Sequence, residues 1–118
     1  MRIIFRFIFA LSILYSYKSV SAEYAFENLA IGKIRAVGDY TGSTFDNTVE
    51  IWLQVPLTLP AQFPCSVNSR VYIDKKNEHL VSAAYMAFAA GKKININVDS
   101  SLPMRNGSCE ISFLDVIY

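Results

Sequence analysis

The chain lacks most of the side chains from which enzyme sites are built. Its 118 residues include one histidine, His79, and two cysteines, Cys65 and Cys109. A zinc site needs three or four such ligands at set spacings, and neither the number nor the spacing is present. A hydroxyl–histidine–carboxylate arrangement would depend on His79, which stands at the expected start of a helix, where solvation or capping is its ordinary role. We therefore expect no enzyme activity, with no catalytic residue, no cofactor and no metal.

Motifs for nucleotide and ester chemistry are also missing. The sequence has no G-x-S-x-G segment, and no Gly-Lys-Ser/Thr follows the turn glycines Gly38 and Gly42. Basic residues are few and scattered, with eight in residues 23–118 against ten acidic residues. Nucleic-acid-binding domains carry a basic groove with interleaved aromatic side chains. We expect no nucleic-acid partner.

Long apolar runs are absent beyond the first 22 residues. There, Arg2 and Arg6 precede an apolar run over 7–15, and small residues end the segment at Ala22. This pattern is typical of a secretory signal peptide, and an uncleaved membrane anchor is the alternative. The sequence predicts cleavage after Ala22, no membrane span in the mature chain, and a secreted or periplasmic protein that folds as one domain over 23–118.

The two cysteines are expected to pair with each other. Export places Cys65 and Cys109 in an oxidising compartment, and a chain with two cysteines allows one intramolecular connection. A disulfide closing a loop of this length stabilises a fold by about 4 kcal/mol in the chain-entropy picture. Domains this small often need a covalent link or a partner for stability.

Alternation and turn residues predict a mostly β fold with one helix. Residues 23–28 form a short lead-in, and Gly32 marks a bulge or bend inside the first strand. A helix between caps at Asn77 and Gly91 buries the stripe Leu80, Ala84, Ala87 and Phe88. The strands are expected at residues 29–37, 49–55, 70–73, 94–98 and 110–118. The order β-β-β-α-β-β favours a five-stranded OB-fold-like barrel, and a small α+β sheet with a covering helix is the alternative.

The phase of the second and third strands predicts a ligand surface. If Ile51 and Leu53 face the core, Trp52 faces outward, and polar or aromatic neighbours surround it. An exposed aromatic ring among hydrogen-bonding groups can hold a sugar ring. The alternative places Trp52 under the proline-rich loop or in a subunit contact. The candidate ligand residues are Glu50, Trp52, Gln54, Arg70 and Tyr72.

The helix carries no charge between Leu80 and Ala90, including on the side away from the core. Small residues let another chain approach closely, and methionine fills irregular gaps. We therefore expect Ala83, Met86 and Ala90 to form the contact face of a homo-oligomer. The alternative is a monomer in which the loop 56–69 covers this face.

The signal peptide, Cys65, the helix segment 84–92 and Cys109 together resemble small exported bacterial proteins related to the B subunit of subtilase cytotoxin, an AB5 toxin. This resemblance implies an OB-fold barrel with a Cys65–Cys109 disulfide, a ring of five copies, cell-surface glycan binding and a separate exported catalytic subunit. The toxin subunit holds its sugar with a serine near the start of the first strand. This chain has Leu29, Ala30 and Ile31 there, with no hydroxyl.

Two functions follow as hypotheses. The first is an exported, non-enzymatic binding module that recognises a glycan or another cell-surface partner and assembles as a homo-oligomer, plausibly a pentamer. The second is a stand-alone periplasmic structural or interaction protein with no glycan ligand. A fold alone does not decide between them, because function depends on the site that the fold carries.

Overall fold

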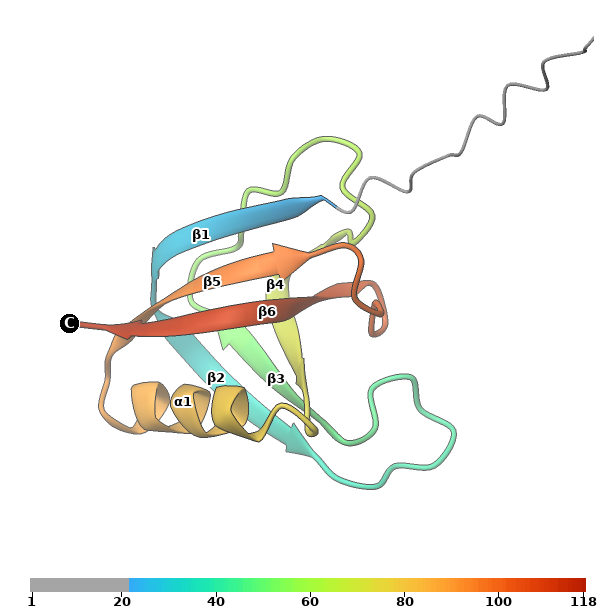
Figure 1. Cartoon of the computed structure of the whole chain (residues 1–118), viewed down its shortest axis with the longest axis horizontal. Coiled ribbons are helices and arrows are strands. Elements are labelled where there is room, and N and C mark those ends of the chain that lie inside the picture. The colour runs from blue at the N-terminus through green and yellow to red at the C-terminus, as the bar shows by residue number, and fades with distance from the viewer. Residues whose placement is uncertain (1–21) are drawn as a thin grey trace, which may run out of the picture.

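The computed structural model describes residues 22–118, so the expected signal peptide at 1–22 lies outside these residues except for Ala22. Six strands and one helix follow each other along the chain (Figure 1). The elements are β1 (Glu23–Leu29), β2 (Ile31–Val37), β3 (Thr48–Leu53), β4 (Val67–Asp74), α1 (Glu78–Ala89), β5 (Lys93–Asp99) and β6 (Ser108–Ile117). The expected mostly β fold with one helix is confirmed.

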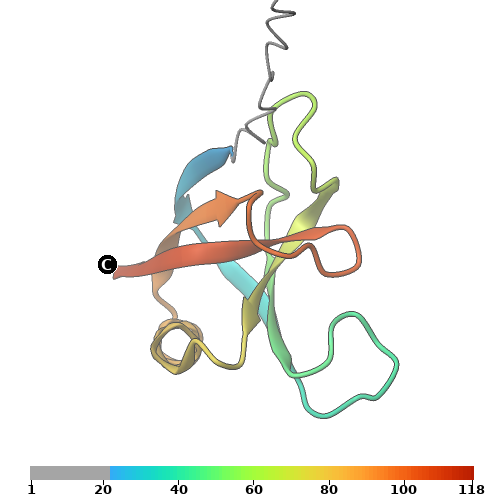
Figure 2. The same cartoon turned by 45° about the vertical axis from the view of Figure 1, so that its right-hand side comes forward.

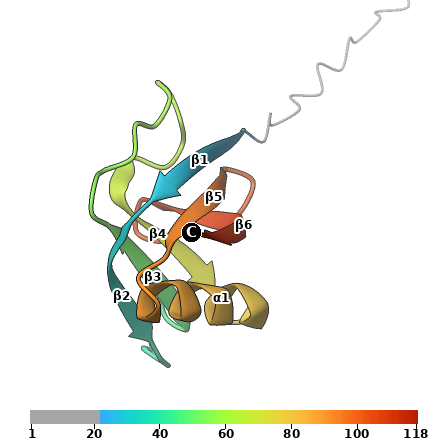
Figure 3. The same cartoon turned by 90° about the vertical axis from the view of Figure 1, so that its left-hand side faces the viewer.

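All six strands belong to one sheet, in the order β1-β5-β6-β4-β3-β2. β4 and β6 are parallel, whereas the other neighbouring strands are antiparallel. The two edge strands, β1 and β2, are consecutive in the chain and are separated by Ala30 alone. The sheet curves so that β1 and β2 leave this joint in different directions (Figure 3). It is nevertheless open, because β1 and β2 do not pair with each other, so an open sheet takes the place of the expected OB-fold-like barrel.

The expected count of five strands is also wrong, because residues 23–28 are not an irregular lead-in. Asn28 adopts a left-handed φ of 60°, and the pairing of β1 with β5 shifts between Phe26 and Leu29. This irregularity ends β1 and sends the chain into β2 at the opposite edge. Gly32 does mark an irregularity, since the β2–β3 register shifts between Ile31 and Lys33.

The other strand boundaries differ from expectation near proline and at loop ends. β3 stops at Leu53, two residues earlier than expected, and Val55 is exposed just before Pro56. Proline lacks the N–H that would continue the ladder, which accounts for the early end of β3. β4 starts three residues earlier than expected, at Val67.

The helix begins and ends at the expected places. Asn77 occupies the N-cap position, but its carbonyl, not its side chain, accepts from the amides of Leu80 and Val81. Gly91 closes the helix at φ 64°, with the Lys92 amide donating to the Ala87 carbonyl. Many helices end in this way: a glycine in the left-handed conformation turns the chain, so that an amide beyond the helix donates to one of its last carbonyls.

The core lies between α1 and the inward face of the sheet. The expected helix stripe is buried at Leu80, Ala84 and Ala87, but Phe88 is 46% exposed and is not core. Phe88 follows directly after Ala87 in the last turn, so its side chain leaves the narrow buried arc of the helix. The disulfide between Cys65 and Cys109 is confirmed; its Cα atoms are 5.3 Å apart and both side chains are buried.

Candidate ligand-binding surface

Sheet register gathers polar and aromatic side chains on the face opposite the core. Lys33 of β2, Trp52 of β3 and Arg70 of β4 are cross-strand neighbours in one row. The next row holds Arg35, Glu50 and Tyr72. Side chains at directly paired positions share a face of the sheet, so these two rows form one continuous surface.

Trp52 stands at the centre of this surface and is half-buried. Three cations surround its ring: Lys33 Nζ lies 4.1 Å, Arg70 Cζ 5.0 Å and Arg35 Cζ 5.7 Å from the ring centroid. They come from β2 and β4, on either side of β3. Each such contact contributes about 0.5–1 kcal/mol at exposed sites and holds the indole in place. The remaining exposed part of the ring is therefore a fixed aromatic surface.

Glu50 is surrounded by the other side chains of these two rows and is not open to a ligand. It is 2% exposed, and it accepts hydrogen bonds from Tyr72 Oη at 2.5 Å and from Trp52 Nε1 at 3.2 Å. Arg35 Nη1 lies 3.4 Å from Glu50 Oε2, and Arg70 Nε lies 4.0 Å from Glu50 Oε1. A buried carboxylate is costly unless several donors surround it, and four side chains do so here.

Tyr72 is likewise unavailable for direct contact, because its side chain is fully buried. Burial, followed by the hydrogen bond to Glu50, raises the pKa of Tyr72 to about 12. The phenol is therefore neutral at physiological pH and acts as a donor to the carboxylate. The expectation that Glu50 and Tyr72 contact a ligand is wrong. Both residues lie on inner strands of the sheet, and the surrounding side chains bury them.

Gln54 does not join this surface either. It follows the end of β3 and is exposed. With Phe88 and Lys92 it lines a hollow of about 160 Å³ at the end of α1. Of the five candidate residues, the structure therefore leaves Trp52 and Arg70 accessible on this surface, whereas Gln54 is accessible elsewhere.

Sequence reasoning missed two members of the surface, Lys33 and Arg35. Their i, i+2 spacing on β2 was the available signal, but only the hairpin register places them beside Trp52 and Glu50. We call Lys33, Arg35, Trp52 and Arg70 the Trp52 surface. It carries three positive charges around the single carboxylate of Glu50, so the basic residues of this chain are less scattered than the sequence indicates.

The expected oligomer face is exposed in part. Met86 is 58% exposed, Ala90 is exposed and Ala83 is half-buried. The loop that was the alternative cover lies at the other end of the molecule: α1 and the loop after β3 stay apart in all three views (Figures 1, 2 and 3). Residues 60–64 of that loop line a hollow with Glu23 and Tyr24 instead. The loop therefore does not cover α1.

Apolar exposure continues from α1 to the C-terminus. Met86 and Lys92 line a hollow of about 290 Å³ with Val116, Ile117 and Tyr118. Tyr85 and Phe88 of the helix are also exposed. We call Met86, Ala90, Val116, Ile117 and Tyr118 the helix face. Apolar surface of this kind usually marks a contact with another molecule.

Within residues 22–118, no group of three or more His, Cys, Asp or Glu side chains is placed to hold a metal ion. No helix in the same part of the chain is long and apolar enough to cross a membrane. No protein-family model matches the chain, and no curated protein matches it significantly. The Trp52 surface and the helix face are therefore the features of the molecule that bear on its function.

Proposed function

We propose that the protein is an exported, non-enzymatic binding module whose Trp52 surface recognises a carbohydrate carrying an acidic group. The observation that carries this proposal is the half-exposed Trp52 ring held among Lys33, Arg35 and Arg70. Aromatic rings pack against the apolar face of a sugar, and guanidinium groups bind carboxylate or sulfate in a bidentate manner. The Cys65–Cys109 disulfide is compatible with the export that this function requires.

The two kinds of contact have different expected roles. Lys33 is exposed and lies closest to the indole, so an incoming sugar displaces its flexible side chain from the ring. Arg35 and Arg70 lie 3.4 and 4.0 Å from the Glu50 carboxylate, which favours their present positions. Preorganised cations lose less side-chain entropy when a ligand binds, which favours binding by the two arginines.

The test is binding of the purified, oxidised protein to an immobilised set of neutral and acidic glycans. We expect retention of acidic glycans, with affinity falling as salt is added because exposed charges are screened. Trp52→Ala is expected to abolish retention while the circular dichroism spectrum stays that of the folded protein. Tyr40→Ala, which removes an exposed aromatic from the loop after β2, is the matched control and should bind normally.

Lys33→Ala separates the role of charge from that of the ring. It uncovers the indole and removes one cation, so we expect weaker binding of acidic glycans and unchanged or stronger binding of neutral ones. Unaltered binding by folded Trp52→Ala would contradict the proposal. Binding of single-stranded oligonucleotides in place of glycans would show that the surface has a different ligand class.

We also propose that the protein assembles into a homo-oligomer, and the helix face supports this. Met86 and Tyr118 are large exposed residues, and no other described segment covers them. The same surface also fits the other hypothesis, a periplasmic interaction protein with no glycan ligand. A folded protein that retains no glycan would favour that second function.

A further inference from the structure

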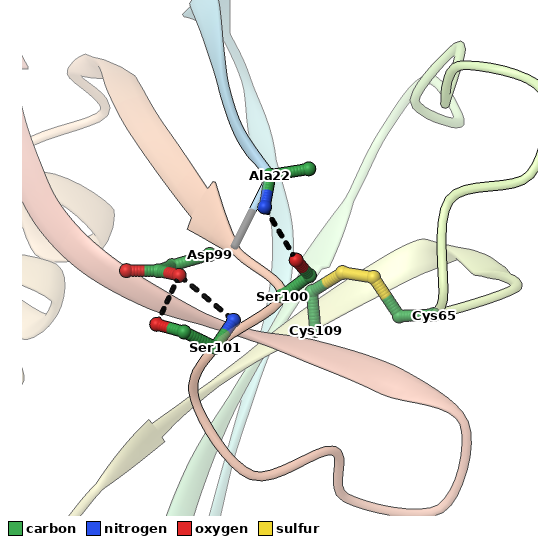
Figure 4. The surroundings of a disulfide bond; sticks show 6 residues. All are labelled: Ala22, Cys65, Asp99, Ser100, Ser101 and Cys109. Atoms are coloured by element: carbon green, nitrogen blue, oxygen red, sulfur yellow. Dashed lines mark hydrogen bonds between the residues drawn. A yellow bond between two sulfur atoms is a disulfide. The ribbon is translucent and has the colours of Figure 1, made fainter. Parts of the chain in front are cut away.

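The first strand begins at the residue that signal-peptide cleavage would make N-terminal. β1 starts at Glu23, and Glu23 pairs with Asp99 at the end of β5. The preceding residue, Ala22, still touches this region. Its amide donates to Ser100 Oγ at 2.8 Å (Figure 4). Its carbonyl accepts from the Ser100 amide at 3.0 Å. The predicted cleavage point is therefore a structured part of the sheet edge.

Acidic side chains meet at this corner. Glu23 is paired with Asp99, and Asp99 is in turn paired with Glu110 of β6, so three acidic residues follow each other across β1, β5 and β6. Asp99 and Glu110 are buried, and Glu110 Oε2 has no hydrogen-bond partner. Residues 60–64, which lie beside Glu23, include no charged side chain. Two cations act on Glu110, Arg105 from the loop before β6 and Lys76 from the turn after β4, and the carboxylate of Asp74 acts in the opposite sense.

Asp99 is held as an acceptor. The amide and hydroxyl of Ser101 donate to its Oδ1 at 2.9 and 2.6 Å (Figure 4). The hydrogen bonds from Ser101, the hydroxyl first, lower the pKa of Asp99 despite its burial. Both Ser101 bonds use the same carboxylate oxygen. Oδ2 remains to accept from another group.

We propose that hydrolysis of the Ala22–Glu23 bond creates an ion pair between the new α-ammonium group of Glu23 and the carboxylate of Asp99. The inference rests on the proposed export. A signal peptidase adds one water to the peptide bond, leaving a carboxylate on Ala22 and an amino group on Glu23. The Cα atoms of directly paired antiparallel residues are about 4.5–5.5 Å apart, which puts the ammonium within range of the Asp99 side chain.

This ion pair would replace the two Ala22–Ser100 hydrogen bonds as the tie between the start of β1 and the end of β5. An α-amino group has an ordinary pKa of about 7.7–8.0, so it is charged at neutral pH. Pairing with Asp99 raises the folded-state pKa of the amine above that value. Its contribution to stability is then complete below about pH 7.7 and is lost as pH rises through the folded-state pKa.

The experiment compares three purified chains: residues 23–118 with a free amine, the same chain Nα-acetylated, and residues 22–118, which begin with Ala22. At pH 7 we expect the free-amine chain to melt about 2–4 °C above the other two. This difference should vanish by about pH 10, where the amine is neutral. It should also vanish when Asp99→Asn is introduced into all three chains.

Glu27→Gln is the matched control, because it removes an exposed carboxylate from β1 at a position not paired with Asp99. It should leave the difference intact. Equal melting temperatures of the free and acetylated chains would overturn the ion pair, as would a more stable Ala22-extended chain. The mass of the protein recovered from the periplasm tests cleavage separately, so a failure of export and a failure of the ion pair are distinguishable.

Discussion

The hydroxyl of Tyr72 donates a hydrogen bond to the carboxylate of Glu50, and both side chains are buried on adjacent strands. This hydrogen bond joins β3 to β4 in the row next to Trp52 and Arg70. Glu50 also lies within 4.0 Å of Arg35 and Arg70, so its charge attracts both guanidinium groups. The stability of the fold and the geometry of the candidate site therefore depend on the same carboxylate.

Tyr72→Phe removes that donor and leaves the ring. We expect a loss of about 1–3 kcal/mol in the free energy of unfolding, because a buried carboxylate loses one of its partners. Urea denaturation followed by tryptophan fluorescence measures the change. Tyr85→Phe, at an exposed helix position, is the control and should be close to neutral. Equal midpoints for the two variants would mean that the Tyr72–Glu50 bond contributes little.

Glu110→Gln is expected to stabilise the protein at neutral pH. Burial raises the pKa of Glu110, so its charged form is less favourable in the folded than in the unfolded state. Stability therefore increases as pH falls through the folded-state pKa, and this increase is complete below about pH 4. Glutamine resembles the protonated carboxyl at every pH. Melting curves from pH 4 to pH 8 should converge at the acidic end and separate at the neutral end, whereas Asp39→Asn, in an exposed loop, should give parallel curves.

Replacing both cysteines, Cys65→Ser and Cys109→Ser together, is expected to reduce the free energy of unfolding by about 4 kcal/mol. The disulfide spans 44 positions in sequence and joins two buried side chains, so its loss frees a long loop in the unfolded chain. Denaturant titration with and without a reducing agent measures this contribution. The reducing agent should destabilise the natural protein and leave the double variant unchanged.

Ala83→Glu with Met86→Lys is expected to convert an oligomer into a stable monomer. Met86 is largely exposed and Ala83 is half-buried at the helix surface, so a charge at either position can reach solvent in the isolated chain. Light scattering gives the mass of each form, and thermal melting gives its stability. A natural protein that is already monomeric would contradict assembly through the helix face.

Local signals in the sequence predicted the helix and the disulfide well. Asn77 and Gly91 mark the two ends of α1 correctly, because the start and the end of a helix depend on residues that are close in sequence. The cysteine pair needed no geometry, since the chain offers one pairing. Trp52 was placed outward correctly by simple alternation with the buried Ile51 and Leu53.

Features that depend on register were not predictable. Lys33 and Arg35 reach Trp52 only because the ten residues between β2 and β3 return the chain in one particular alignment. Alternation separates inward from outward positions, but it does not distinguish an outward residue in water from one covered by its neighbours. Alternation along the strands places Glu50 and Tyr72 on the outward face, yet both side chains are buried. β1 was missed because its burial is low along most of its length, which leaves little hydrophobic pattern to detect.

The disulfide also determines how the chain responds to a pulling force. It joins the segment just before β4 to β6, so β4, α1 and β5 lie inside a covalently closed loop, while β1, β2 and β3 precede it. When the two chain ends are drawn apart, tension passes through the sulfur–sulfur bond and bypasses that loop. The oxidised protein can therefore lengthen only by the residues outside 65–109, and the parallel contact between β4 and β6 stays tethered after the first three strands have been extended.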